Sequence, residues 1–224
     1  MRLTRTQPRA LAIVVLVVAV AGCGGAPGGS PAQATPSASV AESPGANSAV
    51  LWPAPPDPMA RTVAAGLKPG PKEYLTNHFH AHLDVFVDGK PITVPAGIGI
   101  NINDPAVRRG DEPDGSVSYG GIDLCNEPCI SPLHTHQVSG IIHSESSDPT
   151  PHTLGQFFIE WGVALSETCV ADSCSPAKKI AFYVNGEPFA GDPRAIELTD
   201  QKEIAIVIGT PPAEIPKTAD FSRP

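Results

Sequence analysis

Residues 78–87 constrain the fold most, because apolar side chains occupy every second position of this segment. The apolar row is Phe79, Ala81, Leu83, Val85 and Val87, and the alternate row begins with His78, His80, His82 and Asp84. Successive side chains of a strand point to opposite faces of a sheet, so this period of two predicts a half-buried strand. Its apolar face is expected in the core, and its three histidines are expected together on the other face.

Further strands and one helix complete the expected fold. Asp88-Gly89 is a hairpin signal that leads into residues 90–94, and strand pairs are expected near residues 133–144 and 179–189. Another strand is expected at residues 203–209. Thr153 and Gln156 have the spacing of a capping box, and an apolar helical stripe follows: Leu154, Phe157, Phe158, Trp161 and Leu165. We therefore predict a mainly β fold, an antiparallel sandwich or barrel-like domain with one packed α-helix.

The first 57 residues have the composition of an export signal and a tether. Residues 1–22 combine a basic start with a short apolar run, which is typical of a signal peptide. Val20-Ala21-Gly22-Cys23 resembles a bacterial lipobox, which implies that Cys23 is lipidated after cleavage; an ordinary signal peptide is the alternative. Residues 23–57 are rich in Gly, Pro, Ala and Ser and are expected to form a disordered tether. Residues 58–224 would form a single β-rich domain.

The charge distribution limits the partners. The chain has a formal net charge of -8, and loss of the three signal-peptide arginines leaves 12 basic against 23 acidic residues. Such a chain is not expected to bind nucleic acid, and the lipid rather than charge would hold it on the extracytoplasmic face of the cell membrane.

Four cysteines remain once Cys23 is set aside. In an exported chain they predict two disulfides, and we favour the local pairs Cys125–Cys129 and Cys169–Cys174, although the spacing also allows crossed pairing. Alternatively, Cys125, Cys129 and the later His134 resemble the binuclear copper loop of cytochrome oxidase subunit II. This chain departs from that loop in the position of the histidine and in having no following methionine.

All seven histidines lie between residues 78 and 152, and six of them form two groups. The second group is H-T-H-Q-V-S-G-I-I-H. If Ser139-Gly140 is a two-residue hairpin turn, His136 faces His143 and His134 faces Glu145. That register would place all four side chains on one face of the hairpin.

Converging imidazoles of this kind are typical of a divalent transition metal site, with zinc or copper favoured. We predict a mononuclear site of His134, His136 and His143, completed by His80 or His82 if the two hairpins face each other. Asp84 and Glu145 are candidates for a further ligand or for orienting a ligating imidazole. The alternative is that these are surface imidazoles bonded to acids or main chain. His78 is the weakest member of its group, and His152, beside Pro151, is expected to be structural.

Two resemblances bear on function. H-x-H with a later histidine and an acid is similar to the cupin metal motif, which implies a metalloenzyme with three histidines and a glutamate, although the order of the ligands differs here. The motif L-H-T-H-x-x-S-G-x-I-H-x-E-S, with T-L-G-x-F-F after it, resembles a group of exported bacterial and archaeal proteins. That resemblance implies one domain over roughly residues 79–209 and no particular activity.

The leading hypothesis is a lipid-anchored protein that captures, buffers or delivers metal; the alternatives are a cupin-like metalloenzyme and an interaction domain without metal. Because the sequence contains no recognisable catalytic motif, enzyme activity is left open and is not favoured.

Overall fold

The computed structural model describes residues 51–222, which fall within one compact unit. The predicted signal peptide, Cys23 and most of the predicted tether lie outside these residues. The helices are α1 (Pro58–Ala64), α2 (Leu154–Trp161) and the short 3-10 helix η1 (Pro193–Ala195). The strands are β1 (Asn77–Val87), β2 (Lys90–Ile92), β3 (Arg108–Asp111), β4 (Val117–Gly120), β5 (Leu133–His134), β6 (Ile141–Ser146), β7 (Cys169–Val170), β8 (Ser173–Cys174), β9 (Ile180–Val184), β10 (Glu187–Phe189) and β11 (Lys202–Ile208).

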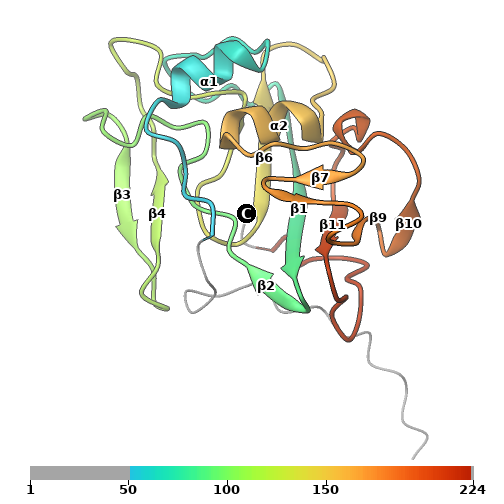
Figure 1. Cartoon of the computed structure of the whole chain (residues 1–224). Coiled ribbons are helices and arrows are strands. Elements are labelled where there is room, and N and C mark those ends of the chain that lie inside the picture. The colour runs from blue at the N-terminus through green and yellow to red at the C-terminus, as the bar shows by residue number, and fades with distance from the viewer. Residues whose placement is uncertain (1–50, 223–224) are drawn as a thin grey trace, which may run out of the picture. The chain divides into compact units, whose positions relative to one another are not determined.

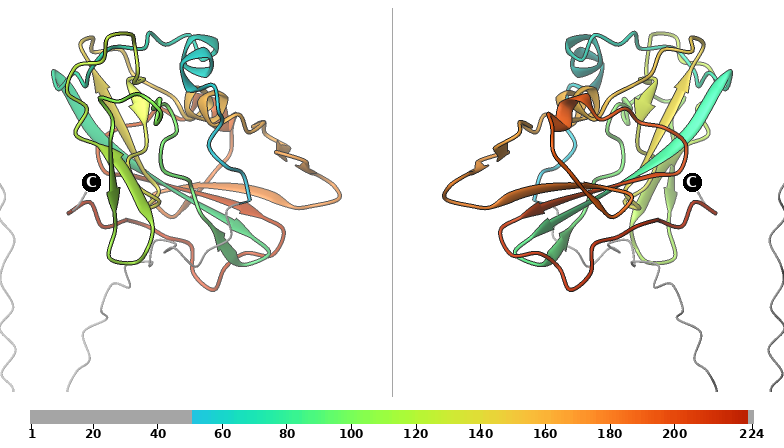
Figure 2. Two further views of the ribbon diagram at one scale, coloured as in Figure 1. Left: turned by 90° about the vertical axis from the view of Figure 1, so that its left-hand side faces the viewer. Right: turned by 90° about the vertical axis from the view of Figure 1, so that its right-hand side faces the viewer.

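Seven of these strands form the main sheet, in the order β10-β9-β11-β1-β6-β5, with β2 paired to β1 (Figure 1). The pairing of β1 with β11 is parallel, whereas every other pairing in this sheet is antiparallel. The β3–β4 hairpin lies toward the β5 end of the sheet, and β9 and β10 extend at the opposite end (Figures 1 and 2). The predicted mainly β fold with a packed helix is confirmed, and its main sheet is mixed.

Two hairpins turn at Asp-Gly and Asn-Gly dipeptides, the first of them at the predicted Asp88-Gly89. Asp88 and Gly89 have φ values of 48° and 80° between β1 and β2, and Asn185 and Gly186 have 51° and 80° between β9 and β10. Positive φ at both central residues is the requirement of the tight turns that match strand twist, and Asp-Gly and Asn-Gly satisfy it at low cost.

The core lies between the apolar face of β1 and helix α2. Ala81, Leu83 and Val85 are fully buried in one cluster with Phe157 and Trp161 of the helix. Thr153 forms the predicted capping box with Gln156, and α2 ends at Gly162, whose φ is 75°. The predicted helical stripe is therefore cut short, and Leu165 packs against the same core from the following loop.

The second face of β1 is also covered over the C-terminal half of the strand, contrary to the expectation of one open face. His82 and Asp84 are only 1% and 3% exposed. The main chain at Ser139 and the ring of Phe221 lie against His82 and help to enclose this face. His82 and Asp84 therefore lie in a buried layer, where their charges and hydrogen bonds must be satisfied internally, whereas His78 is exposed and His80 is half-buried.

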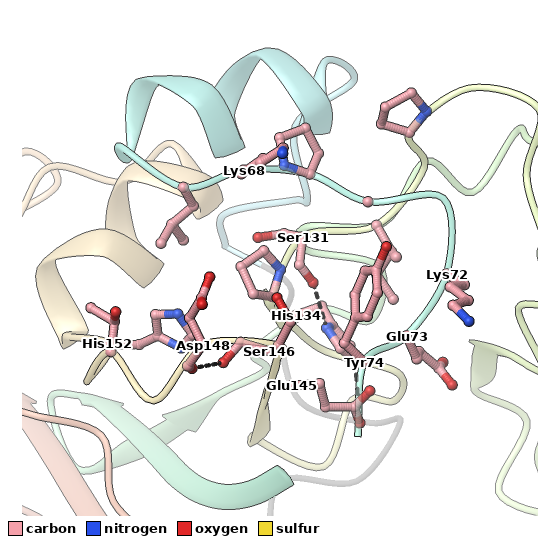
Figure 3. Close-up of a pocket in the computed structure, with 18 of the residues that line it drawn as sticks. Lys68, Lys72, Glu73, Tyr74, Ser131, His134, Glu145, Ser146, Asp148 and His152 are labelled. Atoms are coloured by element: carbon pink, nitrogen blue, oxygen red, sulfur yellow. Dashed lines mark hydrogen bonds and ion pairs between the residues drawn. The ribbon is translucent and has the colours of Figure 1, made fainter. Parts of the chain in front are cut away.

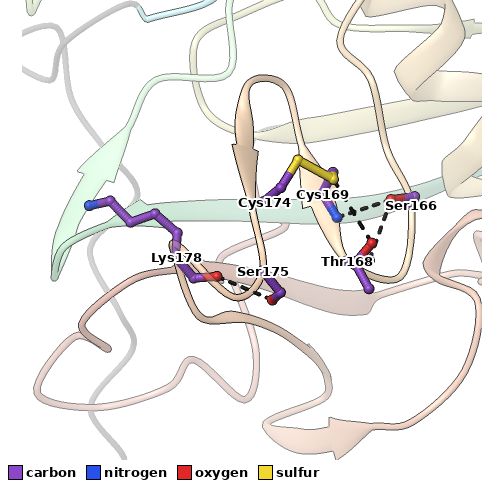
Figure 4. Close-up of a disulfide and its surroundings, with 6 residues drawn as sticks. All are labelled: Ser166, Thr168, Cys169, Cys174, Ser175 and Lys178. Atoms are coloured by element: carbon purple, nitrogen blue, oxygen red, sulfur yellow. Dashed lines mark hydrogen bonds between the residues drawn. A yellow bond between two sulfur atoms is a disulfide. The ribbon is translucent and has the colours of Figure 1, made fainter.

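Helix α1 and the β3–β4 and β7–β8 hairpins were not predicted from the sequence. The structure joins the cysteines in the favoured local pairs, Cys125–Cys129 and Cys169–Cys174. The second disulfide links β7 to β8, and Ser166 accepts a hydrogen bond from the main chain of Cys169 beside it (Figure 4). Across residues 51–222, no helix combines the length and apolar character needed to span a bilayer.

Candidate metal centre

Two short strands, the long strand β1 and one loop bring five histidines and one glutamate together. In the register of the sheet, His134 of β5 lies opposite His143 of β6, and His143 lies opposite His80 of β1. The next row of the same face holds Glu145 opposite His78. These residues fall into two overlapping groups of four whose possible ligand atoms lie within 4.8 Å of one another. The groups are His78, His80, His143 and Glu145, and His134, His136, His143 and Glu145.

The hairpin register predicted from Ser139-Gly140 is wrong, although three of the predicted ligands do meet. His134, and not His136, faces His143, and β5 ends at His134. The next residues bond elsewhere: the Thr135 amide donates to Ile98, and the Tyr119 amide donates to the carbonyl of His136. His136 therefore reaches the cluster from a loop and not from a strand.

Hydrogen bonds fix the tautomers of His134 and His136. Nδ1 of His134 lies 2.9 Å from the main-chain oxygen of Ser131, and Nδ1 of His136 lies 2.5 Å from that of Tyr119. A carbonyl oxygen only accepts, so each neutral ring must carry its proton on Nδ1. Both Nε2 atoms are then unprotonated and carry a free lone pair, and the two atoms lie 3.1 Å apart. Two facing lone pairs repel, and a cation between them removes the repulsion.

Glu145 lies between the remaining imidazoles. Its Oε1 is 3.2 Å from His143 Nδ1, 3.2 Å from His78 Nε2 and 3.9 Å from His134 Nε2. Its second carboxylate oxygen, Oε2, is buried and has no hydrogen-bond partner. A buried carboxylate oxygen without a donor is costly in a metal-free site, and a bound cation would satisfy it.

The burial of the cluster keeps its central imidazoles unprotonated. Desolvation, followed by the neighbouring His136 and His143, holds the pKa of His134 well below its usual value. Burial and the same kind of histidine repulsion lower the pKa of His143 to about 3 and that of His80 to about 4. At neutral pH these rings are ready to donate lone pairs without first losing a proton.

His82 does not join this cluster, although the sequence had suggested it as a ligand there. Its Nε2 donates to the main-chain oxygen of Ser139 at 2.9 Å. Its Nδ1 lies 2.8 Å from Glu203 Oε2 and 3.8 Å from Asp84 Oδ2. His82, Asp84 and Glu203 thus form a separate, fully buried group that could also hold a cation. Burial alone would lower the pKa of His82, but the hydrogen bond and charge of Glu203, with Asp84, raise it.

A second layer of polar contacts supports His134. The Ser131 hydroxyl donates to Glu160 of α2 and accepts the main-chain N–H of Leu133, while the Ser131 carbonyl receives the His134 Nδ1 proton. Burial raises the pKa of Glu160 to about 8, against the opposing hydrogen bonds of Ser131 and Thr62. Helix α2 therefore positions the residue that orients His134, a common arrangement around metal ligands.

A cavity of about 500 Å³ reaches the cluster (Figure 3). His134 and Glu145 form part of its wall, and Glu73 and Tyr74 line it from the segment before β1. The disulfide loop holds this segment in place, since the Cys125 and Cys129 amides donate to main-chain oxygens at residues 71 and 70. Because Cys125 and Cys129 are bonded to each other, the alternative of a copper-binding thiolate loop is wrong.

Three site residues were missed or undervalued in the sequence. His78, the weakest candidate of its row, belongs to the cluster, and Glu73 lies 3.7 Å from His136 Nε2. Glu203 could have been placed on the polar face of its strand by the alternation of residues 204–208, but nothing local indicated that this strand pairs with β1. His152 lies outside the cluster on the wall of the same cavity, and its Nδ1 is hydrogen-bonded to the Ser144 hydroxyl at 2.7 Å.

Comparison of the chain with protein-family models, with curated proteins and with solved structures gives no match. The geometry of the site is therefore the basis for a functional proposal.

Proposed function

We propose that this protein binds a divalent transition metal ion, zinc or copper(II), at the cluster of His134, His136, His143 and Glu145. The observation that carries the proposal is the pair of bare Nε2 atoms of His134 and His136 at 3.1 Å. Metal–nitrogen bonds of about 2.0–2.1 Å in a tetrahedral site place two ligand nitrogens about 3.3 Å apart. The observed spacing is close to that value, and the hydrogen bonds to Ser131 and Tyr119 hold it.

The donor set supports the choice of metal. Neutral imidazoles and a carboxylate suit Zn(II) and Cu(II), and no free thiolate or methionine lies in the cluster to favour Cu(I). All four side chains come from the described β5–β6 region, so binding requires no large rearrangement of the chain. Capture, buffering or delivery of the ion is the role that this set supports.

The cavity beside the cluster favours a second candidate, a metalloenzyme. His134 and Glu145 contribute to its wall, so a water or a small ligand could reach an ion bound there. A closed, four-coordinate ion would support storage, whereas an exchangeable water on the ion would support catalysis.

Metal content tests the proposal directly. We expect the full chain, purified in mild detergent and dialysed against zinc, to retain metal measured by elemental mass spectrometry. Replacing His134, His136 and His143 together with alanine should remove the ion held by these residues and so lower the retained metal. His152→Gln is the matched control, because it removes a buried histidine outside the cluster, and it should retain metal like the wild type. Equal metal in the triple variant and the wild type would refute the proposal.

We also propose that the chain is anchored by lipid at Cys23 on the extracytoplasmic face of the membrane. The lipobox-like residues 20–23 and the composition of residues 24–57 support this proposal. Cys23→Ala should move the protein from the membrane fraction to the soluble fraction. Retention of this variant in the membrane after a salt wash would contradict the anchor and would leave the metal site untouched.

A further inference from the structure

The cluster contains more ligands than one ion needs. Five imidazoles and one carboxylate converge, whereas a tetrahedral zinc ion takes four ligands. In a six-coordinate site, opposite ligand atoms lie about 4.2 Å apart, twice a typical metal–nitrogen bond, and this is the largest separation that one ion allows. The ligand atoms of the six residues do not all lie within even 4.8 Å of one another; they form two groups of four at that limit.

The two groups repeat one arrangement of paired rings. The Nε2 atoms of His134 and His136 are 3.1 Å apart, and their ring planes meet at 75°. The Nε2 atoms of His78 and His80 are 3.0 Å apart, and their ring planes meet at 78°. In the first pair, the tautomers leave both Nε2 lone pairs free to bind a metal ion. The second pair has nearly the same Nε2–Nε2 distance and nearly the same angle between its ring planes.

Glu145 is placed to serve both pairs. Its Oε1 is within 3.2 Å of His78 and 3.9 Å of His134, and its buried Oε2 has no other partner. A carboxylate with two available oxygens can bridge two metal ions about 3.5–4 Å apart, the spacing of two-metal sites. His143 lies between the pairs, and its ring centroid is 4.4 Å from those of both His80 and His136. It can therefore complete the coordination of one of the two ions.

We propose that the cluster holds two divalent metal ions, one between His134 and His136 and one between His78 and His80, with Glu145 bridging them. This inference rests on the proposed function and adds a second site to it. The inner ion is enclosed, since His134 is fully buried, whereas the outer ion lies beside His78, whose side chain is 37% exposed.

Stoichiometry distinguishes this inference from the proposed function. We expect the full chain to bind two zinc ions per chain, measured by elemental mass spectrometry after dialysis. The double variant His78→Ala/His80→Ala should bind one, and His152→Gln should bind two. One ion in the wild type would overturn the second site while supporting the proposed function, and no ion would overturn both.

The buried group of His82, Asp84 and Glu203 must be tested as the other location of a second ion. Glu203→Gln should leave the stoichiometry at two. If this variant bound one ion while the His78→Ala/His80→Ala variant bound two, the bridged pair would be wrong.

A spectroscopic measurement on the wild type does not depend on the folding of any variant. Two Cu(II) ions about 3.5–4 Å apart are expected to couple magnetically, so the electron paramagnetic resonance spectrum should differ from that of isolated Cu(II) ions. A spectrum of isolated Cu(II) ions at a loading of two copper ions per chain would contradict the bridged pair.

Discussion

Glu160→Gln tests whether the buried carboxyl group beside Ser131 is protonated in the folded protein. Glu160 is fully buried in α2, and its pKa is raised from 4.5 to about 8, chiefly by loss of hydration. Between these two values the folded state binds a proton that the unfolded state has released. Stability therefore falls as pH rises through this window, by about 1.4 kcal/mol for each pH unit. Glutamine resembles the protonated carboxyl group and cannot ionise, so the variant should escape this loss.

The expected result is a pH-dependent difference in stability between the variant and the wild type. From pH 5 to pH 9, the free energy of unfolding of Glu160→Gln should gain about 4 kcal/mol relative to the wild type. Urea denaturation of the metal-free chain, in the presence of a chelator and at several pH values, measures this difference. The contributions of the other titrating groups are the same in both proteins and cancel in the comparison. Glu187→Gln, an exposed change on β10, is the control and should show no such trend. A difference that stays constant from pH 5 to pH 9 would refute the assignment of a buried, protonated Glu160.

Three further changes test the framework around the site. Phe157→Ala should lower the free energy of unfolding by about 3–5 kcal/mol, since the ring is fully buried in the core, and a loss below about 1 kcal/mol in urea denaturation would contradict that packing. Replacing Cys169 and Cys174 with serine should cost about 2 kcal/mol, as expected for a short closed loop, and should leave zinc retention unchanged; loss of zinc would show that this hairpin supports the site. Gly99→Ala should destabilise strongly, because its φ is +72° and the added Cβ would lie 2.2 Å from a main-chain oxygen of β5. Gly115→Ala, with φ of +84° and nothing within 4 Å, isolates the backbone cost, and equal melting temperatures of the two variants would contradict the steric argument.

The residues that could be predicted are those whose signal is local. The alternation of residues 78–87 predicted β1, and the Thr153–Gln156 capping box predicted the start of α2. Both signals follow from side-chain period or from hydrogen bonds within one turn, so distant segments do not alter them. The convergence of His134, His136 and His143 was also predicted correctly, although by a wrong register.

The rest depended on contacts between distant segments. The strand β5 stops at His134 because Thr135 and His136 bond to residues 98 and 119, and no local pattern encodes those partners. Likewise, the parallel pairing of β1 with β11 places Glu203 beside His82 and so creates the separate buried group. A sequence can place a histidine on a face, but the strands beside that face determine which histidines share a site.

The candidate ligands differ in exposure from one end of the cluster to the other. His134 donates a hydrogen bond to the Ser131 carbonyl and is completely buried, whereas His78 is more than one third exposed. An ion arriving from solvent meets the exposed imidazoles first and reaches the buried, better oriented ligands second. Buried ligands with fixed tautomers lose little entropy on binding and retain an ion well, whereas exposed ligands exchange it readily. Under the proposed function, this gradient would let metal enter at the exposed end of the site and be retained at the buried end, which suits the proposed capture role better than a purely structural ion.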